Sequence, residues 1–264
     1  MKLGNRLLEI MNESNMDSTN WIIASTILNL GHRIEFTSIK DLAEKCHVSE
    51  ATISRFVRKL GYGSYGGLRQ QAYSITEPNM TQMFHMSSEL LNLIKNKPDI
   101  YLENYSSLIS TSLNDLKDSI NHEQIDSLLH AIHKSKRIFI FSCSTSLMLG
   151  QIVQATLVNY GKIVSMGFNE EQQQALINHI NPDDLVITIS VFGNYIHDNL
   201  ETVQKLTKLT SSKVLITQNP GVQETYYFDQ VVYLTKKNHT ASGFYPMLFG
   251  IEYLIRKYAL LFGT

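Results

Sequence analysis

The sequence is poor in cysteine and in long apolar runs, and both shortages narrow the class of protein. Its two cysteines, Cys46 and Cys143, lie far apart, so they form no metal-ligand spacing and indicate a reducing compartment. No apolar run approaches the length that crosses a membrane, and the amino terminus carries no signal-peptide pattern. We therefore expect a soluble, cytoplasmic protein with no membrane partner, no metal ion and no cofactor.

The chain also has almost no net charge, which at first argues against a nucleic-acid partner. Its 264 residues fit two domains, and 43% of them are apolar, enough for an ordinary core. However, residues 1–76 carry nine Lys and Arg against seven Asp and Glu, whereas residues 77–264 carry 14 against 17. Non-specific affinity for DNA grows with the number of phosphates neutralised. The asymmetry therefore weakly favours DNA binding by the first part, with a dimer needed for tight binding.

Residues 49–60 are the most informative segment, because they combine an apolar helix face with a basic one. At about 100° per residue, one arc holds Ile53, Phe56, Val57 and Leu60. The opposite side carries guanidinium groups, hydroxyls and a methyl group, which suit guanine edges, phosphates and thymine. We expect this DNA-binding face to consist of Ser49, Ala51, Thr52, Ser54, Arg55, Arg58 and Lys59.

The preceding residues complete a known DNA-binding arrangement. Residues 38–45 predict a capped helix, and only Cys46, His47 and Val48 separate it from the helix that Ser49 caps and Gly61 ends. Two helices joined by a three-residue turn, with basic residues facing outward on the second, form the helix-turn-helix pattern. The alternative is a solvated charged face on a small helical domain.

The second part of the chain has a different periodicity. Residues 76–79 and the pair Lys97 and Pro98 interrupt helical patterns, so we divide the chain into residues 1–76, a helical linker of residues 77–120, and residues 121–264. Short apolar runs cover residues 137–142, 162–165, 185–190, 213–217 and 230–234. Helical stretches at residues 147–160, 170–180 and 197–209 separate most of them. This alternation predicts an α/β domain with a five-stranded parallel sheet buried on both faces.

Two of the predicted strands end in loops rich in hydroxyl groups. Ligands of open parallel sheets bind at the carboxyl ends of the strands, and a helix amino terminus attracts anions. If the loops at residues 142–146 and 190–194 adjoin, they form a cup for a phosphate ester, although each loop can also be only a turn with a helix cap. We expect the effector-binding residues to be Ser142, Ser144, Thr145, Ser146, Ser190, Gly193 and Asn194.

Residues 39–62 closely resemble the helix-turn-helix of the RpiR/MurR family of bacterial transcription regulators, and the later strand, serine-rich loop and helix resemble the sugar isomerase (SIS) domain that follows it in this family. The resemblance implies an all-α DNA-binding domain followed by an α/β SIS domain of flavodoxin-like, three-layer α/β/α architecture. It also implies a dimeric or tetrameric regulator of sugar or amino-sugar metabolism genes. Its SIS domain would bind a phosphosugar without converting it.

The chain departs from the family in both loops. Serine stands where the family pattern Gly-x-Gly-x-Ser has its two glycines, and Phe192 and Tyr195 replace a serine and a threonine of the second loop. A hydrogen bond to a charged group contributes about 1.5 to 3 kcal/mol. Losing two hydroxyl donors should therefore weaken phosphate binding, so we expect an effector that differs from a plain sugar phosphate or binds weakly.

Residues 247–262 predict a carboxyl-terminal helix that is apolar on more than one face, so one side can pack on the sheet and the other on a second subunit. We expect a homodimer or homotetramer on a palindromic operator of double-stranded DNA. His197, Glu224, His239 and Glu252 have no spacing that supports acid–base catalysis, and we expect no catalytic residues. Two alternatives stay open: an isomerase fused to a DNA-binding domain, and a regulator whose SIS domain serves only for oligomerisation.

Overall fold

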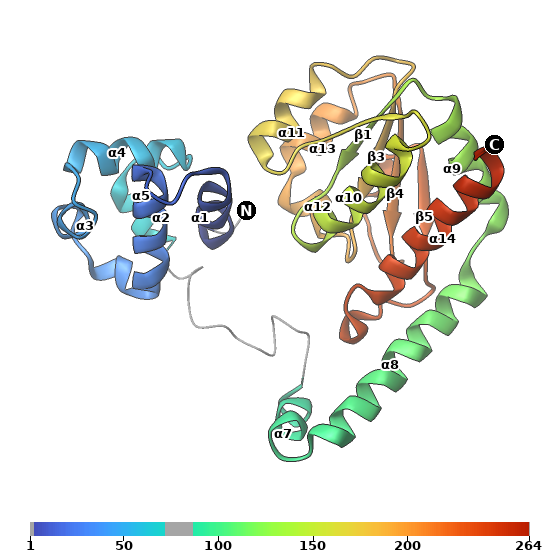
Figure 1. The fold of residues 1–264 in the computed structure, drawn as a ribbon, viewed down its shortest axis with the longest axis horizontal. Helices are drawn as coiled ribbons and strands as arrows, with labels where there is room; N and C mark the ends of the chain where they lie inside the picture. The colour runs from blue at the N-terminus through green and yellow to red at the C-terminus, as the bar shows by residue number, and fades with distance from the viewer. Residues whose placement is uncertain (1–2, 72–86, 264) are drawn as a thin grey trace. The chain divides into compact units, whose positions relative to one another are not determined.

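The chain forms two compact units, Met1–Asn79 and Met80–Thr264, in a computed structural model that describes residues 3–71 and 87–263 (Figure 1). Each unit has its own apolar core. The sequence-based junction at residues 76 and 77 lies outside the described residues. The division into residues 1–76, 77–120 and 121–264 therefore stays a prediction.

The first unit is all helical, as the sequence indicates. Its elements are α1 (Leu3–Glu13), α2 (Thr19–Leu30), the 3₁₀ helix η1 (Gly31–Phe36), α3 (Ile39–Lys45), α4 (Glu50–Lys59) and α5 (Tyr65–Gln70). Leu7, Ile27, Leu42, Ile53 and Leu68 are all fully buried in one cluster. Residues from five helices share this core, which fixes the orientation of each helix face.

The second unit contains a five-stranded, all-parallel sheet with the strand order β2-β1-β3-β4-β5. The strands are β1 (Arg137–Phe141), β2 (Ile163–Met166), β3 (Leu185–Ile189), β4 (Ser212–Thr217) and β5 (Gln230–Tyr233). Each coincides, within one or two residues, with an apolar run predicted from the sequence. The order is that of flavodoxin-like folds, in which the chain reverses direction across the sheet between β1 and β3.

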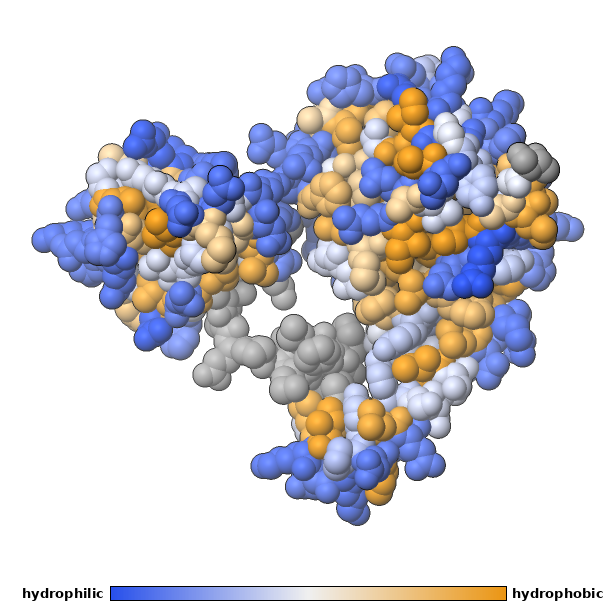
Figure 2. All heavy atoms as spheres, in the orientation of Figure 1, coloured by the Kyte–Doolittle hydropathy of each residue, from blue (hydrophilic) through white to orange (hydrophobic). Residues whose placement is uncertain are grey.

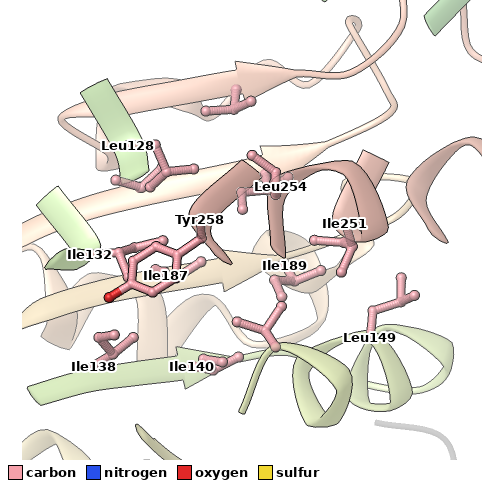
Figure 3. Close-up of a cluster of buried hydrophobic side chains, with 14 of the residues drawn as sticks. Leu128, Ile132, Ile138, Ile140, Leu149, Ile187, Ile189, Ile251, Leu254 and Tyr258 are labelled. Carbon is pink, nitrogen blue, oxygen red and sulfur yellow. The ribbon is translucent and has the colours of Figure 1, made fainter. Parts of the chain in front are cut away.

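Side chains alternate between the two faces of the sheet along every strand. Both faces carry apolar side chains, and helices cover both. Ile138 and Ile140 of β1 face one layer, formed by α9 (His122–Lys134), α10 (Thr145–Val158) and α14 (Tyr245–Phe262); this packing is visible in Figure 3. Phe139 and Phe141 face the other layer, formed by α11 (Glu170–Ile177), α12 (Asn194–Asp198) and α13 (Leu200–Leu206). The predicted three-layer α/β/α architecture is confirmed.

One predicted helix is wrong in its bounds. The sequence suggests a continuous helix over residues 197–209, but the structure has two short helices, α12 and α13, that meet at Asn199. The backbone of Asn199 is non-helical, with φ −129°, and its side-chain amide donates to the carbonyl of Tyr195. A side chain that hydrogen-bonds the neighbouring backbone competes with the helical ladder.

In the described part of the second unit, helices α7, α8 and α9 precede the sheet. The predicted break at Lys97 and Pro98 separates α7 (Ser88–Asn96) from α8 (Pro98–Ser119). Leu116 of α8 is buried in the core beneath the α9–α14 layer, and Tyr105 of α8 meets Tyr245 of α14 edge to face, with ring centroids 6.3 Å apart. Helix α8 is therefore packed on the sheet domain at both Tyr105 and Leu116.

Helix α14 is apolar on more than one side, as its sequence indicates. Ile251, Leu254 and Tyr258 are buried against the sheet, whereas Phe249 and Leu260 are 48% and 82% exposed. Apolar residues are also visible on the surface of this unit in Figure 2. Among the described residues, no helix combines the length and apolarity needed to cross a membrane.

Substitution of a buried sheet residue tests this packing. Ile187 lies on β3, is 1% exposed, and borders an apolar void of about 20 Å³. We expect Ile187→Ala to lower the free energy of unfolding of the second unit by about 2–5 kcal/mol, through lost burial and an enlarged cavity. Denaturant unfolding followed by circular dichroism measures this, because the single tryptophan, Trp21, lies in the first unit.

The matched control is Val158→Ala at the end of α10, where the side chain is 55% exposed. Its effect should stay within about 0.5 kcal/mol, as for other surface changes. Equal effects of the two substitutions would contradict the packing described.

Candidate functional site

The first candidate site is the outward face of α4, which its own capping holds in place. The hydroxyl of Ser49 accepts a hydrogen bond from the backbone N–H of Thr52 at 3.2 Å, so Ser49 is the N-cap, as predicted. The Ser49 and Thr52 hydroxyls are 2.9 Å apart, and Nη2 of Arg55 donates to the Thr52 hydroxyl at 3.3 Å. These contacts align the start of the helix and one guanidinium on the same side.

The two faces of α4 separate as the sequence predicts. Ile53, Phe56 and Val57 are at most 3% exposed, in the core of the first unit. The residues predicted to contact DNA are all exposed or half-buried on the remaining surface: Ser49, Ala51, Thr52, Ser54, Arg55, Arg58 and Lys59. Within the described part of the chain, none of the three cations has an acidic partner. Their charge is therefore available to an external anion.

Contacts at the far end of α4 fix its termination. Gly61 has φ +83°, the left-handed conformation that glycine adopts without strain, and its N–H donates to the carbonyl of Arg58. Arg6 of α1 donates to the carbonyl of Leu60 at 2.6 Å, which places a positive charge at the negative end of the helix dipole. The sequence predicts the role of Gly61. It does not predict the role of Arg6, because Arg6 and Leu60 lie 54 residues apart in the chain.

The turn between α3 and α4 contains one unusual backbone conformation. His47 has φ +52°, which few residues other than glycine adopt. The N–H of Val48 donates to the carbonyl of Ala43 at 2.9 Å, and Cys46 is buried beneath the turn. Reversal of the chain at His47 makes the connection as short as the helix-turn-helix pattern requires.

The second candidate site lies at the carboxyl ends of β1 and β3, which are neighbours in the sheet. The hydroxyl of Ser146, in the first turn of α10, accepts a hydrogen bond from the N–H of Val191 at 3.2 Å. The loops at residues 142–146 and 190–194 therefore adjoin, as the cup hypothesis requires. Gly193 has φ +84°, and a Cβ there would lie 2.4 Å from Val222, so this tight turn requires glycine.

The predicted effector residues divide into two groups in the structure. Ser142, Ser146 and Ser190 are at most 6% exposed, and the Ser190 hydroxyl accepts from the N–H of Tyr195. These three shape the loops from within. Those exposed to solvent are Ser144, Thr145 and Asn194, while Gly193 is half-buried. Ser144 has φ +51° and precedes the first turn of α10, in which the N–H groups of Ser146 and Leu147 donate to the carbonyls of Cys143 and Ser144 at 3.0 and 3.1 Å.

Tyr195, which stands where the family pattern has a threonine in the second loop, points into the core. Its ring is fully buried in the core on the α11–α13 side, and its hydroxyl donates to Oε1 of Gln173 at 2.6 Å. Burial raises the pKa of Tyr195 well above its ordinary value. Gln173 in turn donates to the carbonyls of Ser142 and Gly167 at 2.8 and 3.0 Å. Tyr195 thus braces the ends of β1 and β2.

A third strand end, which the sequence did not single out, borders the same edge. Gln218 follows β4, is fully buried, and donates its backbone N–H to the carbonyl of Val191 at 3.2 Å. Its side chain donates to the carbonyl of Gly243 at 2.8 Å and accepts from the N–H of Met247. Gln218 therefore connects the second loop of the cup to the segment that begins α14. No local pattern reveals a glutamine with this role.

The remaining reactive side chains of this unit form no catalytic arrangement among the residues described. His239 contacts Asp115 at 2.7 Å, and Glu252 forms an ion pair with Arg256, while His197 lies on α12. Burial raises the pKa of the Cys143 thiol to about 11, so it is no thiolate at neutral pH. Across residues 3–71 and 87–263, no three His, Cys, Asp or Glu side chains gather closely enough to hold a metal ion.

Two protein families match this chain, one in each unit. Residues 5–73 match the family described as "Helix-turn-helix domain, rpiR family", and residues 131–256 match the SIS domain. A relative from Providencia stuartii, named as an uncharacterized HTH-type transcriptional regulator in the aarA 3' region, is 21% identical over 207 residues. That match covers 75% of this chain and 71% of the relative.

Two solved structures share the fold. The Vibrio vulnificus NanR protein complexed with ManNAc-6P is 19% identical, covers 99% of this chain and 93% of its own, and has a TM-score of 0.53. The sugar isomerase domain of an RpiR transcription factor from Sphaerobacter thermophilus is 15% identical, covers 63% and 92% respectively, and has a TM-score of 0.52. At these identities the likeness establishes the fold of the chain.

The bond between Tyr195 and Gln173 can be tested by removing one atom. Tyr195→Phe keeps the buried ring but leaves Oε1 of Gln173 without its donor. We expect a loss of about 1–3 kcal/mol in the free energy of unfolding of the second unit, measured by denaturant unfolding with circular dichroism. The control is Tyr226→Phe, where the side chain is 74% exposed. If both variants unfold like the original protein, the brace contributes nothing.

Proposed function

Because the chain belongs to the RpiR family of helix-turn-helix transcriptional regulators with a SIS domain, we propose that it regulates sugar or amino-sugar metabolism genes through a phosphosugar-like effector. The observation that carries the proposal is the face of α4 with three cations and, among the described residues, no acidic partner, opposite a fully packed apolar face. An element that is rigid on one side and cationic on the other suits docking in a DNA groove.

The dimensions and chemistry of α4 support its assignment as the recognition helix. Ten residues span about 15 Å, and the major groove of B-DNA is about 12 Å wide and admits one helix. Thr52, Ser54 and Arg55 lie within its first six residues and would lie nearest the base edges. Arg58 and Lys59 follow one turn later and would lie nearer the phosphates.

Two recognition helices would bind better than one, since the first unit carries little net charge. The exposed apolar side chains Phe249, Leu260 and Leu261 of α14 support a homodimer or homotetramer formed through the second unit. A twofold dimer places its two α4 helices on related half-sites, so the operator would be palindromic. DNA binding of this kind fits a cytoplasmic protein.

The cup at the ends of β1 and β3 is the proposed effector site. Ser144 and Thr145 stand at the amino terminus of α10, where the helix dipole favours an anion. Asn194 adds an exposed amide from the facing loop. A protein of the same fold, NanR of Vibrio vulnificus, is complexed with ManNAc-6P, which supports a phosphorylated sugar as the class of ligand here.

A series of contacts links the cup to helix α8, which lies between the first unit and the sheet in the order of the chain. Gln218 bonds both the cup loop, at Val191, and Gly243. His239, four residues before Gly243, contacts Asp115 of α8 at 2.7 Å. Partial burial alone would raise the pKa of Asp115, but hydrogen bonds led by that from His239 hold it below its ordinary value. An effector that moves the second loop would therefore alter how α8 is held.

We propose no catalytic turnover. The sequence relatives that match this chain are named as transcriptional regulators, and His239, the half-buried histidine near α14, is occupied by its contact with Asp115. An isomerase would need a free acid and base near the first two carbons of the sugar. No contact among the described residues favours that second function.

Arg55→Ala tests the recognition helix. The side chain is exposed and bonds only Thr52 among the described residues, so stability should change by less than about 0.5 kcal/mol. Operator binding should be lost at moderate salt, because a bidentate guanidinium contact to guanine contributes about 1–3 kcal/mol in each subunit. Fluorescence anisotropy with labelled operator measures the affinity.

The control for Arg55→Ala is Lys208→Ala, which removes the same charge from an exposed position in the second unit. It should leave operator affinity within about twofold. Wild-type affinity in the Arg55 variant would exclude α4 as the recognition helix.

Thr145→Glu tests the effector site. The helix dipole stabilises a carboxylate in the first turn of α10, but this carboxylate repels a bound phosphate. Among phosphorylated sugars, amino sugars and unphosphorylated sugars, we expect at least one phosphorylated compound to raise the thermal midpoint of the original protein, and Thr145→Glu to remove that shift. Gln151→Glu, exposed further along α10, should retain it. A shift that survives in both variants would move the ligand elsewhere.

A further inference from the structure

A basic hollow of about 400 Å³ lies on the first unit, between the start of α2 and the side of α4. A water molecule occupies about 30 Å³ of liquid, so the hollow has room for a group far larger than one water. The residues that line it are Thr19, Asn20, Thr52, Arg55, Phe56 and Lys59. None of them is acidic, and two are cations.

The polar groups around the hollow have capacity for an added acceptor. Lys59 has no ion pair within residues 3–71 and 87–263, and Arg55 bonds only the Thr52 hydroxyl there. The half-buried amide of Asn20 makes no hydrogen bond in the same part of the chain. The backbone N–H groups of Thr19 and Asn20 belong to the first turn of α2 and have no acceptor within the helix.

The position of the hollow beside α4 indicates which kind of anion could fill it. Thr52, Arg55 and Lys59 belong both to the hollow and to the proposed DNA-binding face of α4. A helix in the major groove is flanked on each side by the sugar-phosphate backbone, which most protein–DNA hydrogen bonds contact. The start of α2 therefore stands where a backbone phosphate would pass beside α4.

We propose that this hollow seats one phosphodiester of the DNA backbone, held by Asn20, Lys59 and the first-turn N–H groups of α2. This inference rests on the proposed function and extends it, because it makes α2 a second DNA-contacting element that reads no bases. Thr19 and Asn20 then contribute equally to operator and non-operator DNA, since phosphate contacts carry no sequence information.

The main test is Asn20→Asp, with Asn29→Asp as the matched control. Both substitutions add one negative charge to α2, at its opposite ends, and both positions accept a polar side chain. Anisotropy with a mixed-sequence duplex of about 30 base pairs at about 50 mM salt reports phosphate binding without knowledge of the operator. We expect Asn20→Asp to weaken binding at least about tenfold and Asn29→Asp to weaken it by less than about threefold.

A folding defect gives a different result. The helix dipole stabilises a carboxylate in the first turn of a helix. The thermal midpoint of Asn20→Asp should therefore equal or exceed that of the original protein. Trp21 fluorescence follows unfolding of this unit alone. If Asn20→Asp unfolds, Asn20→Ala replaces it and should lower affinity for operator and mixed-sequence DNA by the same factor.

Salt dependence separates the charged contact from the neutral one. Lys59→Ala should reduce the slope of log affinity against log salt by about 0.9 per site, whereas Asn20→Ala should leave the slope unchanged. If the original protein binds the duplex and Asn20→Asp matches Asn29→Asp, the hollow seats no phosphate and the proposed function stands. If the original protein binds no DNA, the proposed function itself fails.

Discussion

Burial of one face of each element is the constraint on which both candidate sites depend. In the first unit, Ile53 and Phe56 of α4 must enter the core, and the helical period then leaves Arg55 and Arg58 on the surface. In the second unit, helices cover both faces of a parallel sheet, so a ligand can reach only the strand ends. Both sites are thus consequences of packing. The DNA-binding face of α4 is the side that does not enter the core, and the cup lies at the strand ends, which the helices do not cover.

The parts of the fold that could be predicted from sequence are those recorded in local periodicity. The capped start of α4 at Ser49, its stop at Gly61 and the five strands each follow from residues close together in the chain. Contacts between distant residues leave no such record. The burial of Tyr195 against Gln173, the link from Gln218 to Gly243 and the hydrogen bond from Arg6 to Leu60 join residues 22 to 54 positions apart. The sequence places Tyr195 in the second loop, but the direction of its side chain into the core depends on a contact with distant Gln173.

Long-range contacts also link the effector site to α8 in the proposed mechanism. Allosteric coupling requires a ligand to favour one of two states. Hydrogen bonds join Val191 to Gln218 and Gln218 to Gly243, and the segment of residues 239–243 then leads to the contact of His239 with Asp115 of α8. Buried polar contacts of this kind have discrete arrangements, because a half-made hydrogen bond in a buried site is costly. A displaced loop would therefore change the way α8 is held in steps, which suits a regulator that must alternate between two DNA affinities.

The most direct test of the account is thermodynamic linkage between its two sites. The affinity of the full chain for its operator is measured with and without a saturating phosphosugar, and the affinity for that sugar is measured with and without operator. We expect both affinities to change by the same factor, about 5-fold to 150-fold, as linkage demands of coupled sites. A phosphosugar that binds the cup while operator affinity stays constant would contradict the claim that the strand-end site controls the face of α4.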